Sequence, residues 1–358
     1  MIRAVPHIAA MSPYALAQLD APAGKRVISL SQNESLRPPS PKVAQAVNEA
    51  VVDAHLYPDP DWTDLRAGLA DLHSIPMDGI LCGNGSMELI ACLTRVYADG
   101  QNTVLAPAHA YPFFRTAAQL VQARFDTAAE ANGRVSVDSL LAAVQTDTRV
   151  VFVANPGNPT GTRISRAELL RLRDGLRDGI LLVIDEAYGE FADHLTEPMF
   201  DLVARGDTVV LRTFSKAYGL AGQRVGWGLF PAAVAAEMRK VMNPNNVSVL
   251  GQKAAAAALL DQAHMRETCR ITSGLRDTFI SRLRSVNFDV ADSFTNFVLI
   301  RLANKKAAES AVQALRGAGV FVRPQGGVGL GNCLRVTVGT EGDLNRAASL
   351  LERWRDEK

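Results

Sequence analysis

The sequence has few cysteines and no long apolar run. Its 358 residues include four cysteines, and none of them belongs to a CxxC pair. Because they also lie too far apart for a zinc ribbon, we interpret them as buried small hydrophobic residues in a reducing cytoplasm. No apolar run approaches the roughly 18 residues that span a bilayer. The N-terminal stretch is a poor secretory signal, since Pro6 and His7 interrupt it.

An excess of charge of one sign is also missing. The chain has 38 Lys and Arg against 37 Asp and Glu, a formal net charge of +1. This balance gives no electrostatic support for binding nucleic acid or an anionic membrane surface, so we expect neither partner. Hydrophobic residues make up 47% and charged residues 21%, close to globular averages. Composition therefore predicts a globular, cytoplasmic protein, of a size that suits an enzyme of two or three domains.

Short apolar runs alternate with helical patterns between about residues 80 and 230. Runs with loops at both ends and helices between them predict a mostly parallel sheet covered on both faces. The strands that we expect are 103–106, 149–153, 180–184, 208–211 and 225–229. For one intervening helix, Ser165 and Glu168 form a capping box, and leucines then repeat at helical spacing. Arg171, Arg173 and Asp174 lie between these leucines, so we expect them to be solvated.

The last third of the chain combines Ala-rich helices with strands and a closing helix. Strands are expected at 294–302, 320–323 and 334–338. Strands followed by a flanking helix predict a smaller α+β domain. We therefore divide the chain into three parts. These are an arm (1–40) that is part of the small domain and contacts a partner subunit, a large domain (41–238) and a small C-terminal domain (239–358).

A lysine follows the strand expected at 208–211. In an open α/β sheet, ligands bind beyond the carboxyl ends of the strands. Lys216 can form an imine with an aldehyde cofactor, because an amine that is desolvated near other cations loses its proton more easily. Thr213 and Ser215 offer hydroxyls, and Arg224 offers a planar guanidinium suited to phosphate.

Two further polar residues follow neighbouring strands. Asn158 lies in the turn NPGNPTG, which its prolines make rigid, and its amide can donate a hydrogen bond. Asp185 directly follows an apolar strand and is either a helix cap or a partner for a buried cation. Asp185 lies 27 residues after Asn158, and Lys216 lies 31 residues after Asp185. Each interval matches one βα unit of about 30 residues, which places all three residues at one edge of the sheet.

The segment GNGSME (83–88) opens a helical pattern. Glycines before a helix N-terminus form an anion site from backbone N–H groups, here those of Gly85, Ser86 and Met87. The segment is not G-x-G-x-x-G, which disfavours a dinucleotide-binding fold. A phosphate site, an imine-forming lysine, a carboxylate for a ring nitrogen and donors for a phenolic oxygen (Asn158, Tyr188) are the groups that pyridoxal phosphate requires.

Four motifs in order resemble those of the fold-type I pyridoxal-phosphate aminotransferases, and most closely those of the histidinol-phosphate aminotransferase family. They are NPGNPTG, DEAY, RTFSKAYGLAGQRVGW and LRVTVGT, and the likeness runs from Asn33 to the final helix. The resemblance implies an α/β fold whose large domain holds a mostly parallel seven-stranded sheet between helices, with a smaller α+β domain. It also implies pyridoxal 5'-phosphate as cofactor, an amino donor and a 2-oxo acid acceptor. The expected reaction converts histidinol phosphate and 2-oxoglutarate to imidazole-acetol phosphate and glutamate.

The resemblance implies a role for each matching residue. Lys216 would hold the cofactor as a Schiff base and then move a proton to and from the substrate Cα. Asp185 would keep the ring nitrogen protonated, while Tyr188 and Asn158 would hydrogen-bond the phenolic oxygen. Arg335 would bind the substrate carboxylate through both arms of its guanidinium.

Further residues match contacts of the substrate with less specific motifs. Tyr57 matches a tyrosine that enters the neighbouring subunit's site, which implies a homodimer. Tyr14 and Arg323 match positions near the distal end of the substrate, although an ordinary structural role is an equal alternative for each. His109 occupies the place of an aromatic residue that covers the cofactor ring, with Tyr111 as the alternative.

Departures from the family pattern leave other activities open. Met87 stands where Asp or Ser is common, and Asn33-Glu34-Ser35 replaces the usual Asn-Glu-Asn-Pro. The same scaffold could serve an aromatic or other amino-acid aminotransferase, or a pyridoxal-phosphate-dependent decarboxylase or cyclase. A cofactor-binding regulator without turnover usually carries a DNA-binding module, and neither an added segment nor a basic charge supports one here.

Overall fold

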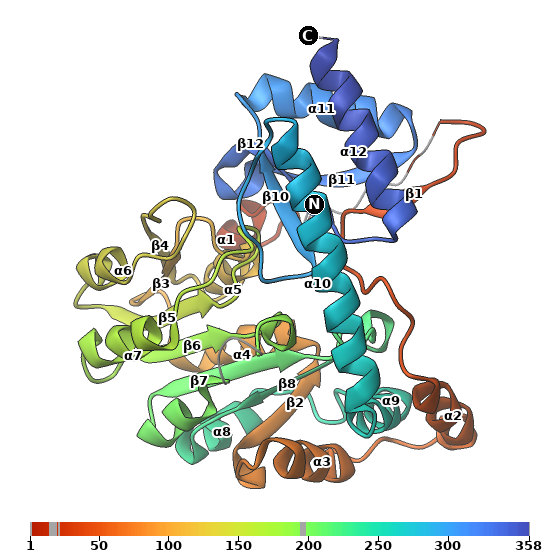
Figure 1. The fold of residues 1–358 in the computed structure, drawn as a ribbon. Coiled ribbons are helices and arrows are strands. Elements are labelled where there is room, and N and C mark those ends of the chain that lie inside the picture. The colour runs from red at the N-terminus through yellow and green to blue at the C-terminus, as the bar shows by residue number, and fades with distance from the viewer. Residues whose placement is uncertain (1, 14–19, 21, 194–197, 358) are drawn as a thin grey trace.

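A seven-stranded sheet lies at the centre of the larger domain, shown in the lower half of Figure 1. The computed structural model describes residues 2–13, 20, 22–193 and 198–357. The strand order is β2-β8-β7-β6-β5-β3-β4, and β8 is antiparallel to both of its neighbours while the other pairs are parallel. The strands are β2 (Ile80–Asn84), β3 (Thr103–Pro107), β4 (Arg124–Ala128), β5 (Thr148–Ala154), β6 (Leu181–Asp185), β7 (Thr208–Thr213) and β8 (Val225–Leu229).

All five strands that the apolar runs predicted in this domain are present. The sequence argument did not assign β2 and β4, the two edge strands of the sheet. In β4, RFDTA leaves most side chains partly or fully exposed, so its apolar signal is weak. The mostly parallel seven-stranded sheet that the resemblance implied is confirmed.

Helices cover both faces of this sheet (Figure 1). The helices of this domain are α2 (Pro41–Ala50), which packs on α9, α3 (Thr63–His73), α4 (Ser86–Tyr97), α5 (Pro112–Leu120), α6 (Val137–Ala143), α7 (Arg166–Gly175), α8 (Ala232–Arg239) and α9 (Val249–Leu259). Short 3-10 turns lie at η1 (Val51–Asp53), η2 (Met77–Gly79), η3 (Gly189–Phe191), η4 (Met199–Arg205) and η5 (Ala221–Gln223).

The capping box predicts the start of α7 correctly, but one expectation about its polar face is wrong. The Ser165 hydroxyl accepts a hydrogen bond from the Glu168 backbone N–H at 3.2 Å. Arg173, which we expected to be solvated, is only 2% exposed. Its guanidinium donates to the carbonyl groups of Ile180 and Leu176 at 2.9 and 3.0 Å. The long side chain thus reaches the loop before β6, where it satisfies carbonyl groups that would otherwise be buried without partners.

The smaller domain is built on a second sheet with the order β1-β11-β12-β10-β9. Strand β1, from the N-terminal arm, pairs in parallel with β11. The strands are β1 (Ile28–Leu30), β9 (Asp289–Val290), β10 (Phe297–Arg301), β11 (Val320–Gln325) and β12 (Leu330–Thr337), with η6 (Gly326–Val328) between the last two. The helices are α10 (Gln262–Ser285), α11 (Lys305–Gly317) and α12 (Glu341–Asp356). The short helix α1 (Pro6–Ala9) of the N-terminal arm contacts α5 of the larger domain.

Two hydrophobic cores correspond to the two sheets. The larger core includes residues of α9 such as Ala254 and Ala258, whereas the buried residues that α10 adds to the smaller core start at Phe279. We therefore propose that the limit between the domains lies within α10 rather than at the predicted residue 238. In the part of the chain that the structure describes, no helix is both long and apolar enough to cross a membrane.

Candidate active site

The carboxyl ends of β5, β6 and β7 bring the predicted polar residues to one edge of the large sheet. Asp185 is the last residue of β6 and pairs with Ala154, the last residue of β5. Asn158 lies four positions beyond Ala154, and Lys216 lies three positions beyond the end of β7. The spacing of one βα unit per strand therefore places these residues at neighbouring strand ends, as the sequence predicts.

Lys216 is held in surroundings that favour its neutral amine. Its Nζ donates to the Asn33 carbonyl at 3.0 Å and lies 5.8 Å from the centre of the Tyr188 ring. Burial, with the positive charges of Arg335 and Arg224, lowers the pKa of Lys216 to about 8. A lysine with this pKa can act as a nucleophile or a base near neutral pH.

Asp185 is a buried carboxylate close to this lysine. Burial, with the nearby charge of Glu186, raises its pKa to about 6, while a hydrogen bond from the Ala187 N–H (3.0 Å) and the charge of Lys216 oppose that rise. The group is therefore ionised near pH 7 and above. A buried anion at this position favours a cationic partner, such as a protonated ring nitrogen.

Asn33 connects this lysine to the small domain, and sequence reasoning missed it as a site residue. Its side-chain amide donates to the Tyr188 hydroxyl at 2.8 Å, and its backbone N–H donates to the Thr337 hydroxyl at 2.9 Å. The side chain of Asn296 donates to the Asn33 carbonyl at 3.1 Å. Asn33 has φ +55°, a left-handed conformation that asparagine tolerates better than most residues. These hydrogen bonds thus hold the Asn33 carbonyl in place, where it accepts the hydrogen bond from the Lys216 amine.

Arg335 contacts both the large domain and the N-terminal arm. Its Nη1 donates to Asn158 Oδ1 at 2.7 Å, and its Nη2 donates to the Ser31 carbonyl at 2.9 Å. Because Asn158 Oδ1 accepts this bond, the donor side of the Asn158 amide faces elsewhere. Arg323 is the direct cross-strand partner of Arg335 in the β11–β12 ladder. Directly opposite side chains lie on the same face of a sheet, so the two predicted substrate arginines are neighbours.

The groups that we predicted to bind phosphate meet where α4 begins. Gly85 has φ +73°, and a Cβ built on it would lie 2.5 Å from Arg224 Nη2. A Cβ on Gly226 would lie 2.2 Å from the Ser86 nitrogen, so both glycines are needed for this close approach. Arg224 Nη1 also donates to the Ser215 hydroxyl at 3.4 Å. A helix N-terminus, a guanidinium and a hydroxyl thus meet here, and this is a suitable set of donors for one phosphate.

Some predicted residues have other contacts in the structure. The Thr213 hydroxyl accepts from the Ser215 N–H (3.1 Å) and donates to the Val225 carbonyl (3.4 Å), so it stabilises the turn that carries Lys216. The Tyr111 ring packs edge-on against Phe114, with centroids 5.7 Å apart. Met87 is half-buried in the first turn of α4. Contacts of Thr213, Tyr111 and Met87 with a cofactor stay predictions, and Tyr14 lies outside the described residues.

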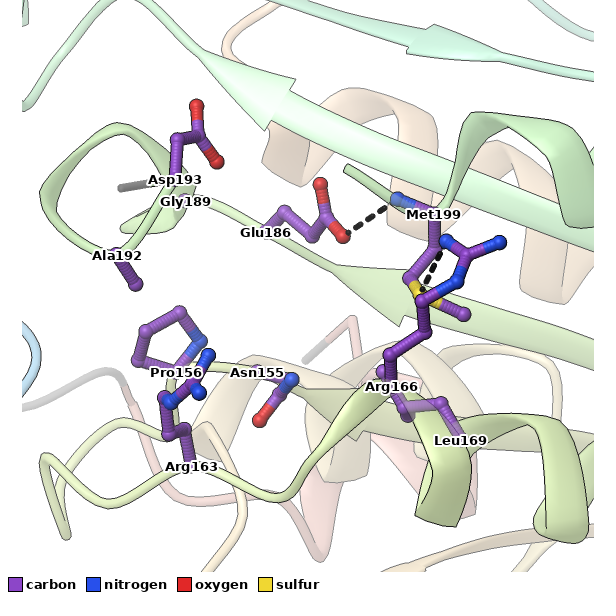
Figure 2. Close-up of a pocket in the computed structure, with 10 residues that line it drawn as sticks. All are labelled: Asn155, Pro156, Arg163, Arg166, Leu169, Glu186, Gly189, Ala192, Asp193 and Met199. Atoms are coloured by element: carbon purple, nitrogen blue, oxygen red, sulfur yellow. Dashed lines mark hydrogen bonds between the residues drawn. The ribbon is translucent and has the colours of Figure 1, made fainter. Parts of the chain in front are cut away.

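A separate pocket lies behind the turn at Asn155 and Pro156 (Figure 2). Glu186 and Asp193 line it together with Arg163 and Arg166, and the Glu186 carboxylate accepts from the Met199 N–H at 3.2 Å. None of the predicted site residues lines this pocket. It is therefore distinct from the site that Lys216 defines.

Comparison with known proteins identifies the family. The sequence model of the aminotransferase class I and II family matches residues 25–351. The chain belongs to this aminotransferase family. It is 40% identical over 354 residues to a histidinol-phosphate aminotransferase of Paramagnetospirillum magneticum, covering 98% of this chain and 97% of the relative. A relative of the same name from Jannaschia sp. is 39% identical over 324 residues, or 90% of each chain.

Solved structures of aminotransferases share the fold. The crystal structure of histidinol-phosphate aminotransferase from Sinorhizobium meliloti in complex with pyridoxal-5'-phosphate superimposes with a TM-score of 0.93. It is 28% identical and covers 100% of this chain and 99% of its own. A Thermus thermophilus aspartate aminotransferase mutant has a TM-score of 0.86 at 19% identity, covering 99% of this chain and 100% of its own, and so shows the fold alone. The predicted fold type and the family resemblance of this aminotransferase are confirmed.

Proposed function

We propose that this aminotransferase uses pyridoxal phosphate to transfer the amino group of histidinol phosphate to 2-oxoglutarate. The products are imidazole-acetol phosphate and glutamate. One observation carries the proposal: Lys216, with its pKa lowered to about 8, lies beside a buried carboxylate and near Arg335, the cross-strand partner of Arg323. The relatives named histidinol-phosphate aminotransferase span nearly the whole chain, which supports this substrate.

The residues at the site fit this cofactor. When bound, pyridoxal phosphate supplies an aldehyde for the amine and a ring that takes up the electron pair of the substrate Cα. We assign the aldehyde to Lys216 Nζ and the ring nitrogen to Asp185, because the buried carboxylate is ionised and calls for a cation. The phosphate is assigned to the start of α4 with Ser215 and Arg224, where the close approach of Gly85 leaves no room for a Cβ. Asn158 and Tyr188 are assigned to the phenolic oxygen.

The chain's own groups then carry out binding and proton transfer. Arg335 binds the α-carboxylate of glutamate through its planar fork, and Arg323 joins it in binding the phosphate of the other substrate. When it is a free amine, Lys216 Nζ takes the proton from the substrate Cα. The Asn33 carbonyl holds that nitrogen in place. A base with a pKa of about 8 is well matched to proton transfer near neutral pH.

Titration of the holoenzyme with single amino donors tests the proposal. We expect histidinol phosphate to abolish the cofactor's absorption band rapidly, and 2-oxoglutarate to restore it. Glutamate should abolish it too, whereas phenylalanine and arginine serve as comparison donors. If histidinol phosphate gives no response and phenylalanine or arginine gives a rapid one, the assigned fold and cofactor stand, but histidinol phosphate is rejected as the substrate.

The pH dependence of cofactor binding follows from the Lys216 amine. Only the neutral amine attacks an aldehyde, and burial and nearby arginines lower the pKa of Lys216 from 10.5 to about 8. We expect the rate at which cofactor-free protein binds pyridoxal phosphate to rise about tenfold per pH unit below pH 8 and to level off above it. Stopped-flow absorbance over a pH series measures this rate. In Arg335→Leu the midpoint should move to higher pH, and a midpoint near 10.5 in the unaltered protein would contradict the assignment.

We further propose that the enzyme is a cytoplasmic homodimer in which Tyr57 completes the neighbouring site. All four cysteines are free thiols, in keeping with a reducing compartment. The segment around η1 exposes adjacent apolar side chains, and such surfaces mark protein interfaces. Exposed fractions are 53% for Val51, 74% for Val52, 58% for Leu56 and 88% for Tyr57.

Mixing two inactive variants tests the shared site. We expect Tyr57→Ala to inactivate every site of its own dimer, and Lys216→Ala to do the same. In a mixed dimer, the subunit that retains Lys216 receives Tyr57 from its partner, so one site is complete. We expect equal mixing with subunit exchange to restore about one quarter of the normal kcat per subunit, the statistical value for random dimers. No recovery despite exchange shown by native mass spectrometry would reject the shared site.

A further inference from the structure

His109 joins the edge of the large sheet to a loop of the small domain. It lies just beyond the end of β3, which is hydrogen-bonded to β5, so it shares the sheet edge with Asn158 and Asp185. Its Nδ1 is 2.7 Å from the Val328 carbonyl oxygen. A carbonyl oxygen can only accept, so Nδ1 carries the hydrogen in this contact. A phenylalanine at this position would have no donor for it.

The contacted loop connects the two strands that carry the arginines. Residues 326–329 read Gly-Gly-Val-Gly and link β11, with Arg323, to β12, with Arg335. Three glycines in four residues make the unfolded loop unusually free, so fixing it requires contacts from outside. The Val328 side chain packs near Leu330, and a Cβ built on Gly329 would lie 3.6 Å from His109 Cε1. The loop therefore packs directly against the edge of the imidazole.

The backbone N–H of His109 is held by Glu130. The Glu130 carboxylate, which follows β4, accepts from the His109 N–H at 3.1 Å. Its second oxygen is buried and has no hydrogen-bond partner among the described residues, and burial raises the pKa of Glu130. A buried carboxylate with an unpartnered oxygen is costly, so the hydrogen bond to the His109 N–H is one that Glu130 cannot readily exchange for another. His109 is thus tied at its backbone to the large domain and at its ring to the small domain.

We propose that His109 is a positioning residue that sets the distance between the catalytic edge of the large sheet and the arginine-bearing hairpin β11–β12. Its Nδ1–H holds the loop 326–329, and the loop fixes how the two strands present Arg323 and Arg335. The consequence for substrate binding rests on the proposed function of these arginines. The restraint on the loop does not depend on that function.

Two substitutions distinguish the effect of the His109 ring from the effect of its hydrogen-bond donor, Nδ1–H. His109→Phe keeps an aromatic ring and removes the donor, whereas His109→Asn removes the ring and keeps an amide N–H near the position of Nδ1. Hydrogen–deuterium exchange of the full-length protein without substrate reports on the loop. We expect amides of residues 326–331 to exchange about three- to tenfold faster in His109→Phe, the effect of losing one hydrogen bond, and to remain near normal in His109→Asn.

Kinetics provide the second readout. In His109→Phe we expect KM for the amino donor to rise about three- to tenfold, and by a larger factor than any fall in kcat. Unchanged exchange in the loop, or faster exchange throughout both domains in both variants, would overturn the proposal. If the loop exchanges faster but histidinol phosphate is not a substrate, the proposed function fails and the positioning role stands.

Discussion

Replacing Lys216 with alanine is expected to reduce kcat by about 10⁴-fold or more, because the protein loses both its nucleophile for the cofactor and its base for the substrate Cα. Among the described residues, Lys216 is the only lysine whose side-chain nitrogen donates a hydrogen bond to Asn33. Single-turnover measurements with histidinol phosphate and with glutamate should show the loss in both half-reactions. Loss in only one would mean that another residue serves as base in the other.

Lys216→Arg is the matched variant for this experiment. It keeps a positive charge in the half-buried position, so the electrostatics of Asp185 and the fold are retained. A guanidinium stays protonated in proteins, so it can neither attack an aldehyde nor accept the Cα proton. We expect activity as low as in Lys216→Ala with normal thermal stability. More than about one hundredth of normal activity in this variant would contradict the assignment of Lys216 as the base.

Arg335→Lys is expected to lower kcat/KM for glutamate by about 10²–10³-fold, since an ammonium cannot reproduce the two parallel, charge-assisted hydrogen bonds of the guanidinium fork. Lysine still binds phosphate as a point charge, so the loss for histidinol phosphate should be smaller. The variant also loses the contacts that Arg335 makes to Asn158 and Ser31. Steady-state kinetics with each substrate varied in turn measure the difference.

Arg323→Leu is the control on the neighbouring strand. Because Arg323 is assigned to the distal phosphate, its loss should impair histidinol phosphate and leave glutamate nearly unaffected. Together the two variants distinguish carboxylate from phosphate recognition by residues that are direct cross-strand partners. Equal losses for both substrates in both variants would mean that the arginines support the fold of the hairpin and do not select the ligand.

The strand ends were predictable because their signals are local. An apolar run followed by a polar residue, repeated once per βα unit, is enough to place Asp185 and Lys216 at the same sheet edge. The contact from Lys216 to Asn33 crosses 183 positions of sequence, and no local pattern indicates it. Recognising it requires knowing that the N-terminal arm joins the small sheet.

Two other differences have separate physical causes. Helical periodicity places Arg173 on the polar side of α7, but it does not show that a long side chain can reach buried carbonyl groups nearby. The Ala-rich helix α9 packs in the larger core, although its small side chains give no sign of which sheet they face. Periodicity therefore identified the elements better than it identified their partners.

The hydrogen bond between Asn33 and Thr337 joins residues 304 positions apart. On the ribosome, the larger domain can fold as soon as α9 has emerged, because domains generally fold as units during synthesis. At that stage Lys216 is already at its strand end, but β12, which supplies Thr337 and Arg335, has not yet been made. The nascent chain can therefore bring Arg335, which we propose binds substrate, to Asn158 only after β12 has been translated. A protein without β12 would retain Lys216 and Asp185 on the large sheet and lack Arg335 and Thr337.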